Sequence, residues 1–310
     1  MDKIQVFILT HNRPTKIQFS IDSVLKQTYK NIELIISDNS TNEDTEKLLA
    51  KNYFNKFKYI RRSNLLTPID HLNIILSEVT ENYFMMFHDD DEMFENMIET
   101  LYKNIVNEKE VIAIGSNAYF KRDSTITKEK VLKINSPSLL LTNYFQVADQ
   151  YILRNGIVPF PSYLYRGVVS KKNYFEIKEG GQNCDMTFIM KLTNIGKIKF
   201  LECPMMNYYV NSNNNHVPDI HNNMKEILDF LINSHGSINY PETIKKIKTL
   251  IVYLEIKQGI LIGKIKFISK KFLYSFCNLF YYSTLNYFPR LFVLIFLRIF
   301  NISTKKIIID

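Results

Sequence analysis

Four acidic residues stand side by side in the first third of the chain, directly after an apolar run. The stretch reads FMMFHDDDEMF from Phe84 to Phe94. Like charges packed this closely repel one another, so the arrangement indicates a bound cation. Alternate residues of an extended segment point to the same side, which predicts that Asp89 and Asp91 share a ligand while Asp90 faces away. Two carboxylates and several waters suit Mg²⁺ or Mn²⁺ bound to a phosphate-bearing substrate.

The same acids could instead form a solvated surface loop, because short motifs often match by chance. Two further polar clusters, at Thr10 to Arg13 and at Asp38, also follow apolar runs directly. If all three runs are neighbouring parallel strands, the three clusters meet at one edge of a sheet, where such sheets bind ligands. This convergence favours the metal site over the solvated loop.

Strand and helix patterns alternate through the first ninety residues. Apolar, β-branched runs predict buried strands, and periodic apolar segments that follow turn residues predict helices. The alternation predicts an α/β fold with a doubly wound, mostly parallel sheet. The expected strands cover residues 4–9, 32–37, 57–61 and 83–87, and the expected helices cover 17–25, 43–51 and 68–79.

The order and spacing of these motifs resemble the family-2 inverting glycosyltransferases, which have the A-type fold with a Rossmann-like nucleotide half. VFILTHNRP resembles the opening strand and nucleotide loop of that family. SIDSVLKQTYKNIELIISDNST resembles its first helix, second strand and acidic turn, and NYFMMFHDDDEMF is similar to its Asp-X-Asp segment. The resemblance is strong over residues 4–95 and extends to about residue 210.

The resemblance implies a nucleotide and metal site at the three strand ends. Asp38 would accept a hydrogen bond from N3–H of uracil or thymine, although a turn Asp that caps a helix is the alternative. Asp91 would hold Mn²⁺ or Mg²⁺, and Asp89 would contact the metal or the ribose. The further nucleotide contacts that the resemblance implies are Thr10, His11, Asn12, Arg13, Arg62, Asp70, Asn73 and Asp90.

Inversion at an anomeric carbon needs a base that takes a proton from the attacking hydroxyl. The segment GGQNCDMTFIMKLTNIGKIKF, residues 180–200, resembles the family's base region, and Asp185 falls at the base position. Cys184 stands where the family commonly has Glu. The alternative is that Asp185 only stabilises a helix N-terminus through the helix dipole.

Two later segments resemble parts of the family that approach the acceptor and the diphosphate. IVPFPSYLYRGVV, residues 157–169, carries Tyr163 and Arg166. Aromatic rings stack on sugars and Arg pairs with phosphate, so both are expected on the acceptor side, with core packing as the alternative for Tyr163. His216 is expected to close over the metal or diphosphate, unless it is a solvated loop residue.

The net charge of +8 is concentrated at the C-terminal end. Residues 244–310 hold ten Lys and two Arg against two acids, which leaves 27 bases and 29 acids in the first 243 residues. The near-neutral first part counts against a nucleic-acid-binding protein. The apolar run 291–300 is too short to span a bilayer but suits an interfacial helix on an anionic membrane. The alternatives are a helical subdomain on the core or a homodimer contact.

These features predict a catalytic domain over residues 1–215 and a helical, basic region over 216–310. The predicted enzyme is a metal-dependent inverting glycosyltransferase that moves a sugar from a UDP-linked donor to a lipid-linked or surface glycan. A dTDP-sugar donor is one alternative, and a catalytically silent nucleotide-sugar-binding scaffold is another, because residue 184 is not an acid. Three widely spaced cysteines fit a reducing compartment, which predicts a cytoplasmic location at the inner membrane face.

Overall fold

The computed structural model describes residues 1–62, 66–122, 125–153, 156–210, 220–235, 243–245, 247–248 and 251. The chain divides into two compact units, Met1–His216 and Val217–Asp310. The second unit contains helix α8 (Ile220–His235), and the expected interfacial helix over 291–300 lies outside the described residues. Over the ranges that are described, no helix combines the length and the apolar character needed to cross a bilayer.

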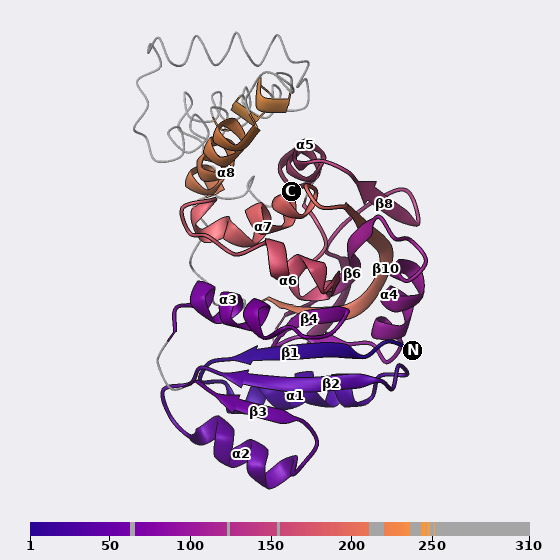
Figure 1. Ribbon diagram of the computed structural model, residues 1–310, viewed down its shortest axis with the longest axis vertical. Coiled ribbons are helices and arrows are strands. Elements are labelled where there is room, and N and C mark those ends of the chain that lie inside the picture. The colour runs from indigo at the N-terminus through magenta and orange to yellow at the C-terminus, as the bar shows by residue number, and fades with distance from the viewer. Residues whose placement is uncertain are drawn as a thin grey trace, which may run out of the picture. The chain divides into compact units, whose positions relative to one another are not determined.

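The first unit is built on an open sheet whose first half is parallel (Figure 1). β1 (Ile4–Thr10) lies between β2 (Ile32–Asp38) and β4 (Tyr83–His88), and β3 (Lys58–Arg61) forms the outer strand beside β2. The crossover helices are α1 (Pro14–Leu25), α2 (Asp44–Asn52) and α3 (Pro68–Glu78). This half confirms the predicted doubly wound arrangement and each predicted element, with small differences at the ends.

Local sequence signals account for where these helices begin. Pro14 and Pro68 occupy first-turn positions, where the missing N–H of proline is harmless. The Thr67 hydroxyl caps α3 by accepting a hydrogen bond from the backbone N–H of Asp70 at 3.1 Å. α2 is an exception, because its N-cap residue Glu43 makes no side-chain cap bond. These signals set the helix starts that follow the site-bearing strand ends.

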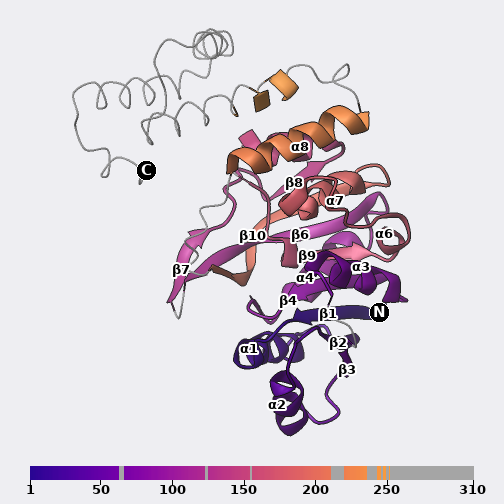
Figure 2. The same ribbon diagram turned by 90° about the vertical axis from the view of Figure 1, so that its left-hand side faces the viewer.

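The second half of the sheet is mixed, and the sequence pattern did not indicate its strands. β9 (Tyr163–Arg166) runs antiparallel between β4 and β6 (Val111–Arg122), and β10 (Lys197–Val210) runs parallel to β6. Three short strands pair at the edges, namely β5 (Glu92–Met93), β7 (Thr125–Lys130) and β8 (Ser138–Leu141). The helices are α4 (Met97–Ile105), α5 (Tyr144–Ala148), α6 (Val168–Lys172) and α7 (Cys184–Leu192), and Figure 2 shows this half from the side.

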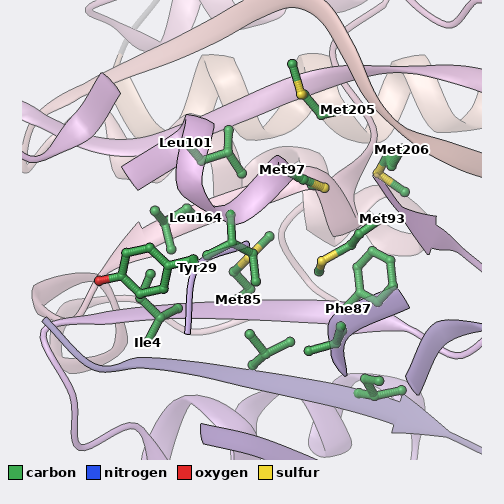
Figure 3. Close-up of a cluster of buried hydrophobic side chains, with 14 of the residues drawn as sticks. Ile4, Tyr29, Met85, Phe87, Met93, Met97, Leu101, Leu164, Met205 and Met206 are labelled. Atoms are coloured by element: carbon green, nitrogen blue, oxygen red, sulfur yellow. The ribbon is translucent and has the colours of Figure 1, made fainter. Parts of the chain in front are cut away.

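A buried hydrophobic cluster holds the acidic segment at both ends (Figure 3). Phe87 precedes the acids at the end of β4, and Met93 follows them in β5, and both are buried. Met97 and Leu101 of α4 pack in the same cluster as Met85 of β4. The acids therefore lie on a short loop between two strands that are anchored in the core. This anchoring limits how far the backbone of the loop, and with it the carboxylates, can move.

Arg166 is a structural residue, and its expected place on the acceptor side is wrong. It pairs with Tyr83 at the start of β4, whereas the acids follow the end of that strand, about 16 Å away at the usual rise per residue. Its guanidinium donates to the carbonyls of Val111 at 2.8 Å and Ile105 at 2.7 Å, and to the Tyr83 hydroxyl at 2.8 Å. Arg166 therefore ties α4 to the strands at the opposite end of the sheet.

Replacing Arg166→Met is expected to lower the free energy of unfolding by about 2–4 kcal/mol, because it leaves several backbone carbonyls without a charged donor. Urea denaturation measures this loss. The matched control is Arg122→Met, whose side chain is 55% exposed and pairs with Glu129, and its effect is expected to stay below about 1 kcal/mol. Equal stability of the two variants would contradict the structural role of Arg166.

Candidate functional site

The loop after β1 holds the first acid of the cluster. The Thr10 hydroxyl donates to Oδ2 of Asp89 at 2.7 Å. Nη1 of Arg13 donates to Oδ1 of Asp89 at 3.0 Å and to Oδ2 of Asp90 at 2.9 Å. Two of the three polar clusters that the sequence placed at one sheet edge therefore touch. Burial raises the pKa of Asp89, and the bonds from Thr10 and Arg13 oppose that rise.

Asp91 is clamped between two other parts of the chain. Its carbonyl accepts a hydrogen bond from the Ser20 hydroxyl of α1 at 2.7 Å, and its Oδ1 accepts one from the backbone N–H of Tyr209 in β10 at 2.8 Å. Oδ2 is buried and has no hydrogen-bond partner in the part of the chain that the structure covers. Burial raises the pKa of Asp91 well above its usual range. A buried carboxylate with one free oxygen is chemically suited to a cation.

The residues that could hold a cation are His88, Asp90 and Asp91, which offer ligand atoms within 4.8 Å of one another. Nδ1 of His88 lies 3.7 Å from the free Oδ2 of Asp91. This set differs from the expected pair of Asp89 and Asp91, because Asp90 does not face away and Thr10 and Arg13 already occupy both oxygens of Asp89. Burial lowers the pKa of His88, which favours the neutral imidazole that binds metals. The donor set fits a divalent ion.

A cavity of about 720 Å³ opens beside the acids. Its polar wall includes Thr10, His11, Arg13, Asp89 and Asp90 of the expected nucleotide contacts. Its apolar wall comes from the start of α3 and the loop before it. The residues of that wall are Leu66, Pro68 and Leu72, and Leu9 of β1 adds to it. A polar end next to acids and an apolar slot suit a molecule with a charged group and a flat ring.

Asp38 does not line this cavity. It is fully buried, its Oδ1 accepts the backbone N–H of Ser40 at 2.8 Å, and its Oδ2 accepts the Tyr59 hydroxyl at 2.6 Å. Arg61 lies 3.5 Å from the same Oδ2. These partners occupy the carboxylate, so this arrangement favours the turn role for Asp38 over the expected bond to a base. Its neighbour Asn39 lines the cavity instead and bonds both backbone groups of Leu66.

Three other expected nucleotide contacts are held by protein partners. Arg62 pairs with both oxygens of Glu78, at 2.6 and 2.8 Å. Asn12, with a positive φ of 55°, exchanges hydrogen bonds with Thr41 of the turn after β2. Asn73 bonds the backbone of Phe175. His11 differs from these, because its ring contacts the Asn39 carbonyl at 2.6 Å and also lines the cavity.

The expected base, Asp185, lies in the first turn of α7 and accepts the backbone N–H of Met186 at 2.8 Å. Burial raises its pKa, which suits a group that must accept a proton. Tyr208 lines the cavity, and burial together with the charges of Asp91 and Asp185 raises its pKa to about 12. The charges of both carboxylates thus act on Tyr208, which lines the cavity, whereas Asp185 itself is not one of the lining residues.

An aromatic stack connects the acids to the helix of Asp185. The ring of His88 lies 6.0 Å from Phe160, which meets Phe175 edge-on at 5.7 Å, and Phe175 stacks on Phe188 of α7 at 4.1 Å. Asn73 of α3 bonds both the N–H and the carbonyl of Phe175, at 2.8 and 2.9 Å. These two hydrogen bonds give Asn73 a structural role in place of the expected nucleotide contact.

Two further expected residues, Tyr163 and Asp70, do not line the cavity. Tyr163 is fully buried and stacks on Tyr165 with ring centroids 5.6 Å apart, so its expected contact with an acceptor sugar is wrong and core packing accounts for it. Asp70 bonds Thr67 at the start of α3. His216 lies outside the described residues.

Sequence reasoning missed His71, Tyr208 and Tyr209, all of which line the cavity. Tyr209 acts on Asp91 through its backbone N–H, which carries no signal in the residue type. The position of Tyr208 depends on β10, a strand that the sequence pattern did not indicate. His71 sits inside a predicted helix, where an isolated histidine gives no indication of the face it occupies.

Comparison with known proteins shows which family the chain resembles. Residues 5–160 match the model of "Glycosyl transferase family 2". The chain is 28% identical over 127 residues to the Escherichia coli UDP-Glc:alpha-D-GlcNAc-diphosphoundecaprenol beta-1,3-glucosyltransferase WfaP, covering 41% of this chain and 50% of WfaP. It is 26% identical over 132 residues to the Campylobacter jejuni GalNAc(5)-diNAcBac-PP-undecaprenol beta-1,3-glucosyltransferase, covering 42% of each. It is 32% identical over 119 residues to Streptococcus pneumoniae glycosyltransferase GlyA, 37% of this chain and 17% of GlyA. The matches thus span half or less of these relatives.

The solved structure of residues 1–349 of S. aureus TarS in complex with UDP has a similar fold. The TM-score is 0.61 at 18% sequence identity, covering 85% of this chain and 75% of the TarS chain. The likeness confirms the expected A-type glycosyltransferase fold. The family match covers half of the chain, and it starts in β1 and ends beyond the acidic cluster. The chain belongs to glycosyl transferase family 2.

Proposed function

We propose that the chain transfers a sugar, with inversion, from a UDP-linked donor to a hydroxyl of a lipid-linked or surface glycan. The observation that carries the proposal is the buried Oδ2 of Asp91, which has no hydrogen-bond partner among the described residues and is grouped with His88 and Asp90, two residues that line the cavity. Two of the relatives support it, because both are named as glucosyltransferases acting on undecaprenol-diphosphate-linked sugars. The UDP complex of TarS supports the uridine donor.

His88, Asp90 and Asp91 would hold Mn²⁺ or Mg²⁺ in this proposal. When bound, the ion supplies positive charge that neutralises the diphosphate as it leaves. Arg13 is half exposed and already lies against Asp89 and Asp90, so its guanidinium is in place to meet the same diphosphate. The apolar slot beside α3 would receive the base of the nucleotide.

Asp185 is the proposed base. It removes the proton from the acceptor hydroxyl, whose oxygen forms the new bond to the anomeric carbon. The bond from that carbon to the diphosphate oxygen breaks on the opposite face, so the proton ends on Asp185 and the electron pair on the diphosphate. A desolvated carboxylate with a raised pKa holds that proton more readily than an exposed one.

Two alternatives remain distinct proposals. A dTDP-sugar donor would use the same chemistry, because thymine differs from uracil only by a methyl group. A silent binding scaffold is suggested by Cys184, which stands beside Asp185 where a second acid would be expected. Turnover distinguishes the scaffold from the enzyme, and a comparison of donors distinguishes the two nucleotides.

A cytoplasmic location at the inner face of the membrane is proposed together with the acceptor. Lipid-linked acceptors are found at that surface, and the excess positive charge of residues 244–310 suits anionic lipid. The alternative roles for this region are packing on the catalytic unit and homodimer formation.

The enzymatic proposal is tested by Asp185→Asn. The purified chain is expected to release UDP from a UDP-sugar in the presence of Mn²⁺ and a suitable acceptor, and the variant is expected to lower kcat by about 10²–10⁴-fold through loss of the base. Donor affinity, measured by calorimetry, should stay unchanged. Asp149→Asn, an acid outside the cavity, is the matched control. Turnover by the variant at the normal rate would mean that another group is the base.

The metal proposal is tested by Asp91→Asn. Because the pKa of Asp91 is raised, the folded state binds the proton of this carboxyl more tightly than the unfolded state does. The free energy of unfolding therefore falls as the pH rises above the ordinary range of Asp. In EDTA at neutral pH the variant is therefore expected to be more stable than the parent by about 1–3 kcal/mol, because it removes a buried unpaired charge.

Thermal unfolding with and without Mn²⁺ completes this test. The parent is expected to gain stability from Mn²⁺ and from Mn²⁺ with UDP, and Asp91→Asn is expected to gain none from the ion alone. Glu92→Gln, the adjacent acid that pairs with Lys121, is the control and should keep the response. An unaltered Mn²⁺ response in Asp91→Asn would contradict the assigned ligand.

The membrane proposal is tested by co-sedimentation of the full-length chain with vesicles. Binding to vesicles with anionic lipid is expected at low salt, with weak binding to neutral vesicles. High salt should release the protein only in part, because screening removes the electrostatic contribution and leaves the apolar one. Absence of binding at low salt would favour core packing or dimer formation.

A further inference from the structure

A histidine on the apolar side of the cavity is held in one defined state by a buried chain of side chains. His71 of α3 is 5% exposed and lines the cavity beside Leu66, Pro68 and Leu72. Its Nε2 lies 2.6 Å from the Ser37 hydroxyl at the end of β2. The function proposed above has no role for this residue, and its neighbours on the wall are apolar.

The direction of the Ser37 bond follows from what surrounds that hydroxyl. Ser37 is fully buried, and Nε of Arg62 donates to its oxygen at 2.8 Å. Arg62 is in turn held by both oxygens of Glu78. Within the described ranges, Nε2 of His71 is the acceptor that the Ser37 proton can reach, so Ser37 donates and Nε2 accepts.

The proton of the imidazole must then be on the other ring nitrogen. Burial and the nearby Arg62 charge lower the pKa of His71 to about 4, so the ring is neutral at physiological pH. A neutral ring whose Nε2 accepts carries its hydrogen on Nδ1. Among the residues that the structure describes, Nδ1 has no protein partner, and it is not one of the fully buried unpaired atoms. Nδ1–H is therefore an available donor on a residue that lines the cavity.

We infer that His71 reads the nucleobase of the donor, with Nδ1–H donating to the carbonyl at position 4 of uracil or thymine. The inference rests on the proposed function, since it assigns a base to the same cavity. Cytosine carries an amino group at that position, which would set one donor against another and leave both without a partner. Asp38, the residue expected to read the base, is buried behind its own partners, so the discrimination falls to His71.

The test compares UDP, dTDP and CDP by calorimetry on the full chain with Mn²⁺. UDP and dTDP are expected to bind with similar affinity, and CDP about tenfold or more weakly, because a buried donor would lose its acceptor. His71→Asn and His71→Gln form a matched pair. The Asn amide places a donor near Nδ1 and is expected to keep most of the preference, whereas the Gln amide reaches toward Ser37 and is expected to lose it through weaker UDP binding.

Ser37→Ala provides a second route to the same question. It removes the group that fixes the ring, and the preference for UDP over CDP is expected to fall while pyrophosphate binding with Mn²⁺ stays unchanged. Equal binding of UDP and CDP by the parent, or an unchanged preference in both His71→Gln and Ser37→Ala, overturns the inference alone. Failure of the parent to bind any of the three nucleotides overturns the proposed function and the inference with it.

Discussion

The burial of Asp91 is the constraint on which the site depends. A carboxylate removed from water is unfavourable unless it is paired, and one oxygen of this group has no partner in the described structure. Three separate parts of the chain hold it there. The core fixes β4 before it, Ser20 of α1 binds its carbonyl, and Tyr209 of β10 binds its other oxygen. These contacts hold the Asp91 carboxylate in one position. A fixed carboxylate is suited to bind a metal ion, whereas a carboxylate on a solvated loop is not held in place.

The other residues of the cluster differ in how firmly their partners hold them. Asp89 is saturated by Thr10 and Arg13, so it orders the loop after β1. Asp90 pairs with the same Arg13, which is half exposed and therefore able to change partners. His88 faces Asp91 from one side. The three acids of one short run thus have three different environments, and the guanidinium of Arg13 relieves the repulsion between two of them, Asp89 and Asp90.

The fold could be predicted as far as local pattern determines it. Strands of β-branched residues and helices with clear starts identified the parallel half, and the order of its strand ends brought the acids to the Thr10 loop. The mixed half could not be predicted, because β9 and β10 are placed by pairing between segments distant in sequence.

The site residues divide along the same line. The sequence placed the acids, Thr10, His11 and Arg13 at one sheet edge, since they lie at strand ends, but it did not indicate that His88 and Asp90, rather than Asp89, group with Asp91. Arg166 and Tyr163 were misassigned because the type of a residue does not show which end of a strand, or which face of a sheet, the residue occupies. Asp38 shows a further limit, as its partner Tyr59 comes from a neighbouring strand and cannot be recognised before the pairing is known.

The aromatic stack from His88 through Phe160 and Phe175 to Phe188 has a consequence for how the protein tolerates change. Each ring is held in place by contact with the next, and Asn73 fixes Phe175 to α3 by two hydrogen bonds. A smaller residue anywhere along the stack would move the acids and the helix of Asp185 relative to each other. The stack therefore couples the loop of the acids to α7, so a smaller ring at one position has to be balanced by a larger side chain at the next to keep that coupling.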